Sequence, residues 1–199
     1  MFVKICGLTH PEHAVAAVEA GADAVGLVFH PPSPRHLDLA TAQRIAGAVA
    51  GRAQVIAVFH HPTRAALARV QSALSPDLFQ VEPMPLSGGC QVLPVFHDGP
   101  DVVPMVLAAT ASHTTVLLDS PVRGGRGVQS DWVRAARLAQ HRRVVLAGGL
   151  DANNVGRAIA TVQPFGVDVS SGVEATPGRK DPDRIYAFIT SARQECIPC

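Results

Sequence analysis

The sequence has few cysteines, almost no charge imbalance and no long apolar run, and each of these absences narrows its class. Four cysteines among 199 residues are too few and too unevenly spaced for the disulfide framework of a small secreted domain. Because 17 Lys and Arg balance 16 Asp and Glu, the chain has no broad positive field for nucleic acid or an anionic membrane. No apolar run reaches the roughly 18 residues of a membrane span, and no signal-peptide pattern begins the chain. We therefore expect a cytoplasmic protein without nucleic-acid or membrane partners.

Neither the cysteines nor the histidines form a recognisable metal motif. Cys196 and Cys199 have C-x-x-C spacing, but they lie at the end of the chain without a second pair, which favours a frayed terminus over a metal or redox site. His10 and His13 could share a helix face, yet no HExxH motif exists, and the nine scattered histidines are expected on surfaces or loops. These residues therefore give no indication of a metal site.

The sequence does contain a regular alternation of short Val-, Ile- and Leu-rich segments with longer Ala- and Arg-rich segments. This alternation is typical of parallel β/α units, whose strands are buried on both faces. Strands are predicted at residues 3–6, 23–29, 54–59, 77–81, 91–96, 114–118, 143–147 and 165–169. Helices are predicted at residues 11–20, 38–50, 63–74, 130–140, 151–160 and 181–193. The pattern predicts one compact (β/α)8 TIM-barrel domain over residues 1–199, with an open doubly wound sheet as the alternative.

Two connections between predicted strands lack a clear helix. The segment between Glu82 and Gln91 is short and contains two prolines and two glycines, so a loop is expected after strand four in place of a helix. Residues 100–111 are ambiguous because Pro104 could either begin a short helix or interrupt one.

The first and sixth predicted strands carry a possible acid/base pair. Alternate residues of a strand share a face, so Lys4 and Cys6 point away from Val3 and Ile5. Ligands of parallel α/β folds bind at the carboxyl ends of the strands, where Cys6 and Asp119 are expected to face each other. A thiolate can remove a proton from carbon, and a carboxylic acid in an apolar site can donate one. A buried apolar Cys6 and a loop-capping Asp119 remain the alternatives.

Two charged contacts are also predicted. Lys4 and Asp168 lie one step below the barrel mouth, on strands that become neighbours if the barrel closes. Burying either charge without a partner costs free energy. We therefore expect them to form a buried ion pair. Arg35 lies in a loop with two nearby prolines, and its planar guanidinium suits a carboxylate ligand; a solvated surface arginine is the alternative.

The loops after the last two predicted strands favour a phosphate site. Gly148 and Gly149 follow one strand, and Ser170, Ser171 and Gly172 follow the next. Glycines allow the backbone N–H groups to approach an anion closely, and these two loops commonly bind phosphate in barrels. The alternative is that the glycines only turn the chain. A small phosphorylated molecule is the partner that this pattern predicts.

Several strings resemble one enzyme family when they are taken together: KICGLT, GADAVGLVF with SPR after it, LLDS, LAGGL, and GVDVSSGVE with PGRKD after it. In this order they resemble phosphoribosylanthranilate isomerase of tryptophan biosynthesis. The resemblance implies an Amadori rearrangement of N-(5'-phosphoribosyl)anthranilate to 1-(2-carboxyphenylamino)-1-deoxyribulose 5-phosphate, without cofactor or metal. It implies Asp119 as general acid, Cys6 as general base and Arg35 on the anthranilate carboxylate. The AGGL and SSGVE loops would hold the phosphate, and a monomer or homodimer is expected.

The chain departs from the family pattern on strands four and five. Gln80, a candidate substrate-binding residue, is kept, but Val81-Glu82-Pro83 follows it where the family usually has Leu-His-Gly. Pro94 replaces a lysine commonly seen on strand five. A catalytically weakened phosphate-binding barrel, or another phosphosugar isomerase or lyase, therefore remains an alternative.

A glycine-rich loop follows strand six. It reads Gly124-Gly125-Arg126-Gly127, where the family tends to have a threonine before the last glycine. The sequence assigns no role to Arg126 or to its neighbour Arg123.

Overall fold

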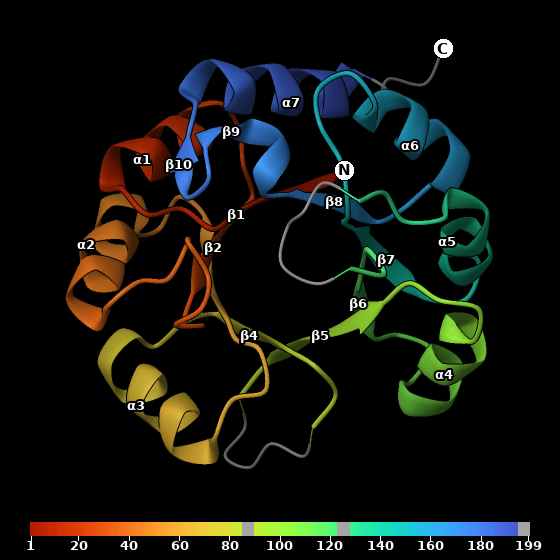
Figure 1. The fold of residues 1–199 in the computed structure, drawn as a ribbon, viewed down its shortest axis with the longest axis horizontal. Helices are drawn as coiled ribbons and strands as arrows, with labels where there is room; N and C mark the ends of the chain where they lie inside the picture. Colours follow the sequence, from red (N-terminus) through yellow and green to blue (C-terminus); the bar gives the residue numbers. More distant parts are fainter. Residues whose placement is uncertain (85–89, 123–127, 195–199) are drawn as a thin grey trace.

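Eight parallel strands close into a barrel (Figure 1). A computed structural model describes residues 1–84, 90–122 and 128–194. The strands are β1 (Phe2–Cys6), β2 (Ala24–Val28), β3 (Gln54–Val58), β4 (Leu78–Val81), β5 (Val92–His97), β6 (Thr115–Asp119), β7 (Arg143–Leu146) and β8 (Gly166–Val169). Each strand pairs with its neighbours in chain order, and β1 pairs with both β2 and β8. The predicted barrel is confirmed, and the open-sheet alternative is wrong because β1 and β8 are joined edge to edge.

Seven α-helices surround the barrel in the described residues (Figure 1). They are α1 (Pro11–Glu19), α2 (Leu39–Val49), α3 (Arg64–Leu74), α4 (Val102–Ala109), α5 (Trp132–Ala139), α6 (Val155–Val162) and α7 (Pro182–Gln194). Two helices begin where capping residues predict: the Asp38 carboxylate accepts the Thr41 N–H at 2.7 Å, and the Thr63 hydroxyl accepts the Ala66 N–H at 3.2 Å. None of the described helices is both long enough and apolar enough to cross a membrane.

Two helices begin later than predicted because polar side chains stabilise other turns. Asp131 caps α5 by accepting the Arg134 N–H, while the buried Ser130 hydroxyl donates to the Ala147 carbonyl at 2.8 Å. Before α6, the Asp151 carboxylate accepts the Asn154 N–H at 3.1 Å and the Asn154 amide oxygen accepts the Asp151 N–H at 2.9 Å. These reciprocal bonds give residues 151–154 a turn of their own.

The two ambiguous connections have different outcomes. Residues 102–109 form α4 with Pro104 in its first turn, where a missing N–H removes no intrahelical bond. In the connection from β4 to β5, the described residues 82–84 and 90–91 lie in no helix, as predicted. The remaining five residues of that connection lie outside the described chain.

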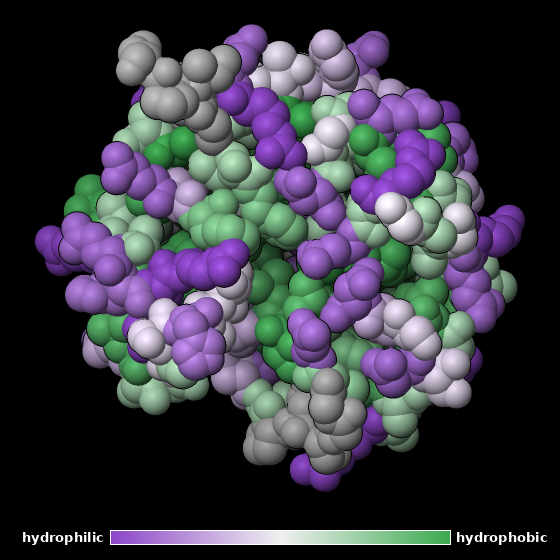
Figure 2. Space-filling view, turned by 180° about the vertical axis from the view of Figure 1, so that it is seen from behind, coloured by the Kyte–Doolittle hydropathy of each residue, from purple (hydrophilic) through white to green (hydrophobic). Residues whose placement is uncertain are grey.

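The apolar core is divided by the barrel wall. One cluster lies among alternating strand residues that face the barrel interior, including Ala24, Ile56 and Leu117. A larger cluster between the strands and the helices includes Val25 and Leu118, the next residues along two of the same strands. On the molecular face behind the view of Figure 1, hydrophilic side chains interrupt the hydrophobic areas (Figure 2). The apolar interior fills the lower barrel and leaves its carboxyl end for polar groups.

A short hairpin follows β8 and was not predicted. After a 3-10 turn at Ser171–Val173, strands β9 (Glu174–Thr176) and β10 (Arg179–Lys180) pair with each other. The Thr9 hydroxyl donates to the Gly178 carbonyl at 2.6 Å, so the hairpin is tied to the loop after β1. Strands of three and two residues are too short to leave a readable alternation in the sequence, although they position two charged side chains described below.

Candidate active site

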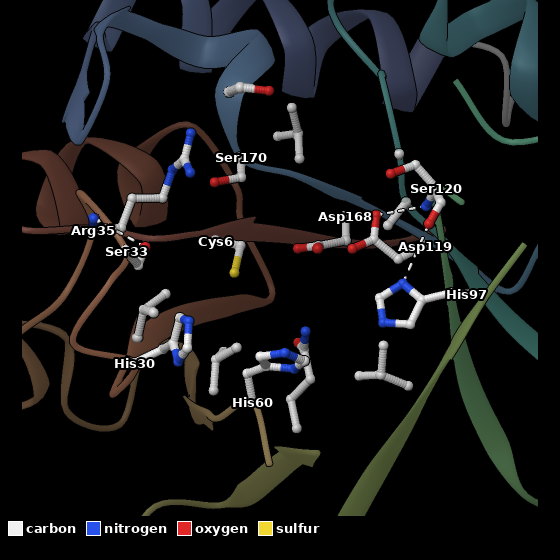
Figure 3. Close-up of a pocket in the computed structure, with 18 of the residues that line it drawn as sticks. Cys6, His30, Ser33, Arg35, His60, His97, Asp119, Ser120, Asp168 and Ser170 are labelled. Atoms are coloured by element: carbon white, nitrogen blue, oxygen red, sulfur yellow. Dashed lines mark hydrogen bonds between the residues drawn. The ribbon is translucent and has the colours of Figure 1, made fainter. Parts of the chain in front are cut away.

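A cavity of about 490 Å³ opens at the carboxyl ends of the strands (Figure 3). Eight of the nine predicted site residues line it: Cys6, Arg35, Gln80, Asp119, Gly148, Gly149, Ser170 and Ser171. Gly172 is the exception, because it packs against the loop after β7 instead: a Cβ added to it would lie 2.0 Å from the Leu150 carbonyl oxygen. The ends of six strands have therefore brought the predicted residues into one place.

Cys6, the last residue of β1, points into this cavity and is 7% exposed. Burial raises the pKa of its thiol because the thiolate is poorly solvated, while the neighbouring Lys4 ammonium opposes that shift. The thiol is therefore mostly protonated in the free protein at neutral pH. Its conversion to a base requires an additional positive charge nearby or a carboxylate that takes the proton.

The predicted ion pair between Lys4 and Asp168 is confirmed. Lys4 Nζ lies 2.8 Å from Asp168 Oδ1, and the two side chains are 0% and 8% exposed. The pair sits across the β1–β8 register, where the two residues are direct partners. Burial lowers the pKa of Lys4, but the charge and hydrogen bond of Asp168, together with those of Cys6, outweigh burial and raise the pKa above its ordinary value. The pair closes the barrel and also places a cation beneath Cys6.

Asp119, the last residue of β6, is partly buried at the opposite side of the cavity (Figure 3). Burial raises the pKa of its carboxyl group, and the nearby Asp168 carboxylate acts in the same direction. The Ser120 N–H donates to Asp119 Oδ1 at 2.7 Å, and His97 on the neighbouring strand favours the ionised form, so both oppose the shift. A carboxyl group with a raised pKa and a fixed orientation is suited to donate a proton.

Arg35 belongs to a buried charged network that the sequence did not reveal. Its Nε and Nη2 donate to the two oxygens of Glu174 at 2.7 and 2.8 Å. Lys180 Nζ donates to Glu174 Oε1 at 2.8 Å and to the Ser170 carbonyl at 2.9 Å. Burial raises the pKa of Glu174, but the Arg35 hydrogen bonds and the Lys180 charge outweigh this effect and lower it. Glu174 thereby fixes the plane of the guanidinium at the cavity wall.

The signal for this network was present in the strings SSGVE and PGRKD. Their glutamate and lysine are Glu174 and Lys180, which face each other across the β9–β10 hairpin. Recognising the contact would have required predicting the hairpin.

The loops after β7 and β8 form one end of the cavity. Gly148 and Gly149 both have positive φ, at 86° and 65°. A Cβ added to Gly148 would lie 2.7 Å from the Ser120 nitrogen, so only glycine allows the loop to approach Ser120, the residue after Asp119, this closely. Ser170 and Ser171 line the same end, with the Lys180 ammonium behind Ser170. Backbone, hydroxyls and a buried cation therefore surround a space suited to an anion.

The β4 side of the cavity carries the departures from the family pattern. Gln80 is 7% exposed, and its Oε1 has no hydrogen-bond partner among the described residues. Glu82 lines the cavity, whereas the buried Pro94 pairs with Val81 on the barrel wall and does not line it. The substitution that alters this wall is therefore Glu82. Arg123, Arg126, Cys196 and Cys199 lie outside the described residues.

The histidines are less scattered than the sequence suggested. His13 is buried in α1, so the expectation of a surface or loop position is wrong for it. Three more, His30, His60 and His97, line the cavity from the ends of β2, β3 and β5. No local spacing in the sequence predicts this grouping, because each lies at the end of a different strand.

Comparison with known proteins agrees with this geometry. A family model described as N-(5'phosphoribosyl)anthranilate (PRA) isomerase matches residues 3–191. The chain belongs to the phosphoribosylanthranilate isomerase family. The family member from Azorhizobium caulinodans is 41% identical over 209 residues, which cover 96% of this chain and 91% of that protein.

Solved structures of the family share the same fold. The phosphoribosyl anthranilate isomerase of Thermotoga maritima superimposes with a TM-score of 0.89 at 35% identity, covering 98% of this chain and 99% of that one. A family structure in complex with reduced 1-(o-carboxyphenylamino)-1-deoxyribulose 5-phosphate gives a TM-score of 0.85 at 34% identity, with the same coverage.

Proposed function

We propose that this chain catalyses the Amadori rearrangement of N-(5'-phosphoribosyl)anthranilate in tryptophan biosynthesis. The observation that carries the proposal is the position of Cys6 and Asp119, which enter one cavity from β1 and β6 beside glycine- and serine-rich loops. An acid, a base and an anion site in one cavity are what the rearrangement of a phosphorylated aminosugar requires. Membership of the isomerase family supports the choice of substrate.

Asp119 is the proposed general acid. Its protonated carboxyl gives a proton to the ring oxygen of the ribose, the bond from that oxygen to C1' breaks, and the anthranilate nitrogen forms a protonated Schiff base with C1'. The raised pKa of Asp119 increases the fraction that holds this proton near neutral pH. The Ser120 N–H keeps the carboxyl in place and stabilises the carboxylate that remains.

Cys6 is the proposed general base. As a thiolate it removes the C2' proton; the electrons form a C1'–C2' double bond and neutralise the Schiff base. The enolamine then takes a proton at C1' and loses its hydroxyl proton to give the ketone. The positive Schiff base lowers the pKa of Cys6 by an opposite charge, which offsets the effect of burial. The Lys4 ammonium, which lies below Cys6 in the barrel, also lowers the pKa of Cys6.

Polar and charged groups at the cavity wall are proposed to hold the two ends of the substrate. The Arg35 guanidinium, oriented by Glu174, faces the anthranilate carboxylate. Gly148, Gly149, Ser170 and Ser171 hold the phosphate, and Gly172 sets the distance between their loops. The unpartnered Oε1 of Gln80 accepts a hydrogen bond from a substrate N–H or O–H group. The relative bound to a reduced deoxyribulose 5-phosphate compound supports a ligand of this kind.

Further properties follow from this proposal. The substrate is a small phosphorylated molecule, and the chemistry uses side chains without a cofactor. A cytoplasmic location accords with a step of amino-acid biosynthesis. A monomer or homodimer remains the expected state, and a related isomerase from Thermotoga maritima is described as dimeric.

A weakened, phosphate-binding barrel is the second candidate, because Glu82 places a carboxylate on the cavity wall. One assay separates the two. Purified protein is mixed with phosphoribosylanthranilate generated in situ, and the fluorescence of the anthranilate group is followed. The isomerase consumes the substrate with multiple turnovers, whereas the weakened barrel binds a phosphorylated analogue and leaves the fluorescence unchanged.

A further inference from the structure

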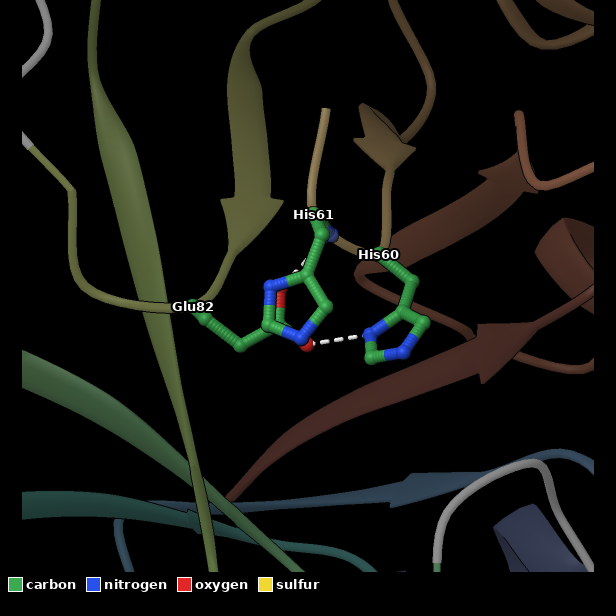
Figure 4. A group of neighbouring side chains, drawn as sticks. All are labelled: His60, His61 and Glu82. Carbon is green, nitrogen blue, oxygen red and sulfur yellow. Dashed lines mark hydrogen bonds and ion pairs between the residues drawn. The ribbon is translucent and has the colours of Figure 1, made fainter. Parts of the chain in front are cut away.

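Two histidines and a glutamate converge at the rim of the cavity (Figure 4). His60 and His61 follow β3, and Glu82 follows β4. One nitrogen or oxygen atom from each side chain lies within 4.8 Å of the corresponding atoms of the other two. These residues are 21 and 22 positions apart in the chain, so the barrel, and not a local motif, brings them together.

Glu82 holds the cluster together. Its Oε1 forms a hydrogen bond with His60 Nδ1, and its Oε2 accepts the His61 N–H at 3.2 Å and lies 3.9 Å from His61 Nδ1. The Glu82 carboxylate therefore lies between two imidazoles.

This donor set matches a divalent transition metal. Imidazole nitrogens with a carboxylate oxygen are ligands of Zn²⁺, and calcium and magnesium prefer oxygen alone. Ligand bonds of about 2.0–2.2 Å place tetrahedral donors about 3.3 Å apart, and the three atoms already lie within 4.8 Å of one another. His60 can move its remaining proton to Nε2 when Nδ1 binds the metal.

We propose that His60, His61 and Glu82 bind a divalent transition metal ion of the Zn²⁺ type. His61 is 62% exposed and Glu82 is 17% exposed, which leaves a path for the ion and a coordination position for water. The backbone of His61 has φ of 45°, an uncommon conformation for histidine that directs its ring back over Glu82 (Figure 4).

The metal site adjoins the substrate cavity without using its acid or base. His60 and Glu82 line the cavity, while Cys6 and Asp119 belong to other strands. The His30 ring packs edge-to-face on His60 with centroids 5.1 Å apart, so metal binding also restrains a third cavity residue. A bound metal ion narrows the cavity and competes with the substrate. The proposal of a metal site does not rest on the proposed function; only the competition with substrate rests on it.

Zinc titration of the full chain by calorimetry tests the site. The titration uses a Cys196→Ser/Cys199→Ser background, because the C-x-x-C pair at the tail could bind zinc itself. We expect one equivalent of Zn²⁺ to bind. Glu82→Gln and His61→Asn should each weaken binding roughly tenfold or more, since each removes a ligand. Asparagine tolerates positive φ, and a glutamine oxygen can still accept the His61 N–H, so both variants keep the local fold.

The exposed His113, far from the cluster in sequence, provides the matched control. His113→Ala should leave zinc affinity unchanged. Cobalt binding should give visible absorption bands of a nitrogen and oxygen site without the near-ultraviolet bands of thiolate ligands, which separates the cluster from Cys6 and Cys90. Absence of saturable binding, or equal affinity in Glu82→Gln, His61→Asn and the parent, overturns the proposal. Turnover without metal, measured alongside, reports on the isomerase separately.

Discussion

The charged side chains on two walls of the barrel mouth differ in their burial and in their pairing. On the β8–β1–β2 wall, Lys4 pairs with Asp168, and Arg35 and Lys180 pair with Glu174, all of them buried. On the β3–β4 wall, His60, His61 and Glu82 are half-buried or exposed. The first wall satisfies each charge within the protein and holds its groups fixed. The second wall leaves its groups within reach of solvent and ions.

This difference predicts which wall is sensitive to substitution and which wall tolerates it. A buried charge without its partner is costly, so the paired wall has little freedom to change. Side chains that remain partly hydrated contribute less through their charge pairs, so the second wall is expected to tolerate substitution better. Glu82, one of the departures from the family pattern, lies on the second wall, whereas the strings that resemble the family supply the charged residues of the first wall.

The largest effect is expected from removing the acid or the base. Cys6→Ser and Asp119→Asn should each reduce kcat by roughly 10²–10⁴-fold, because each deletes a proton-transfer group. Steady-state assays with phosphoribosylanthranilate measure this loss, with urea unfolding to show that the variants remain folded. Retention of more than a tenth of kcat in either variant would contradict the assigned roles.

Breaking the barrel-closing ion pair should have the next largest effect. Lys4→Met leaves Asp168 buried without its partner and should lower the free energy of unfolding by about 3–5 kcal/mol. The double variant Lys4→Met/Asp168→Leu should recover most of this loss, because no buried charge remains. Chemical denaturation of the three proteins gives the comparison. A single variant as stable as the parent would show that the pair contributes nothing to closure.

The buried Glu174 should make stability sensitive to acid. Its pKa is lowered in the folded protein, so its stabilisation is present above the unfolded-state pKa of about 4.3 and is lost as the pH falls through the folded value. Glu174→Gln should therefore be less stable than the parent at neutral pH, by about 3 kcal/mol, with a difference that shrinks in acid. Urea unfolding at several pH values measures it. A difference that is constant with pH would exclude this linkage.

The smallest effect is expected on the β3–β4 wall. Glu82→Gln, measured without added metal, should change kcat by less than about tenfold, because its carboxylate is hydrogen-bonded to His60 and His61, which carry neither the acid nor the base. Its KM is free to shift, since the side chain lines the cavity. Cys6→Ser is assayed under the same conditions for comparison. Equal losses of kcat in Glu82→Gln and Cys6→Ser would contradict the proposed difference between the two walls.

Much of this architecture could be predicted because it follows from strand rules. Eight apolar runs separated by helical segments predict parallel strands, and the strand ends placed Cys6 and Asp119 at one mouth. The Lys4–Asp168 pair followed from side-chain alternation and barrel closure. In each case a regular period fixes where the side chain points.

The unpredicted parts depend on contacts that have no period. The pairing of Arg35 with Glu174 requires a hairpin of two very short strands. The grouping of His60, His61 and Glu82 depends on two loops that meet only after the barrel forms. The phosphate-binding role predicted for Gly172 stays a prediction, and its close packing on the Leu150 carbonyl could not be read from the motif. Local spacing contains none of this information.

The most direct test of the central claim is growth of a tryptophan auxotroph that lacks phosphoribosylanthranilate isomerase. The account predicts that the parent chain restores growth without tryptophan and that Cys6→Ser and Asp119→Asn, expressed to the same level, do not. A well-expressed, folded parent that fails to restore growth, or restoration by the two variants, would contradict it.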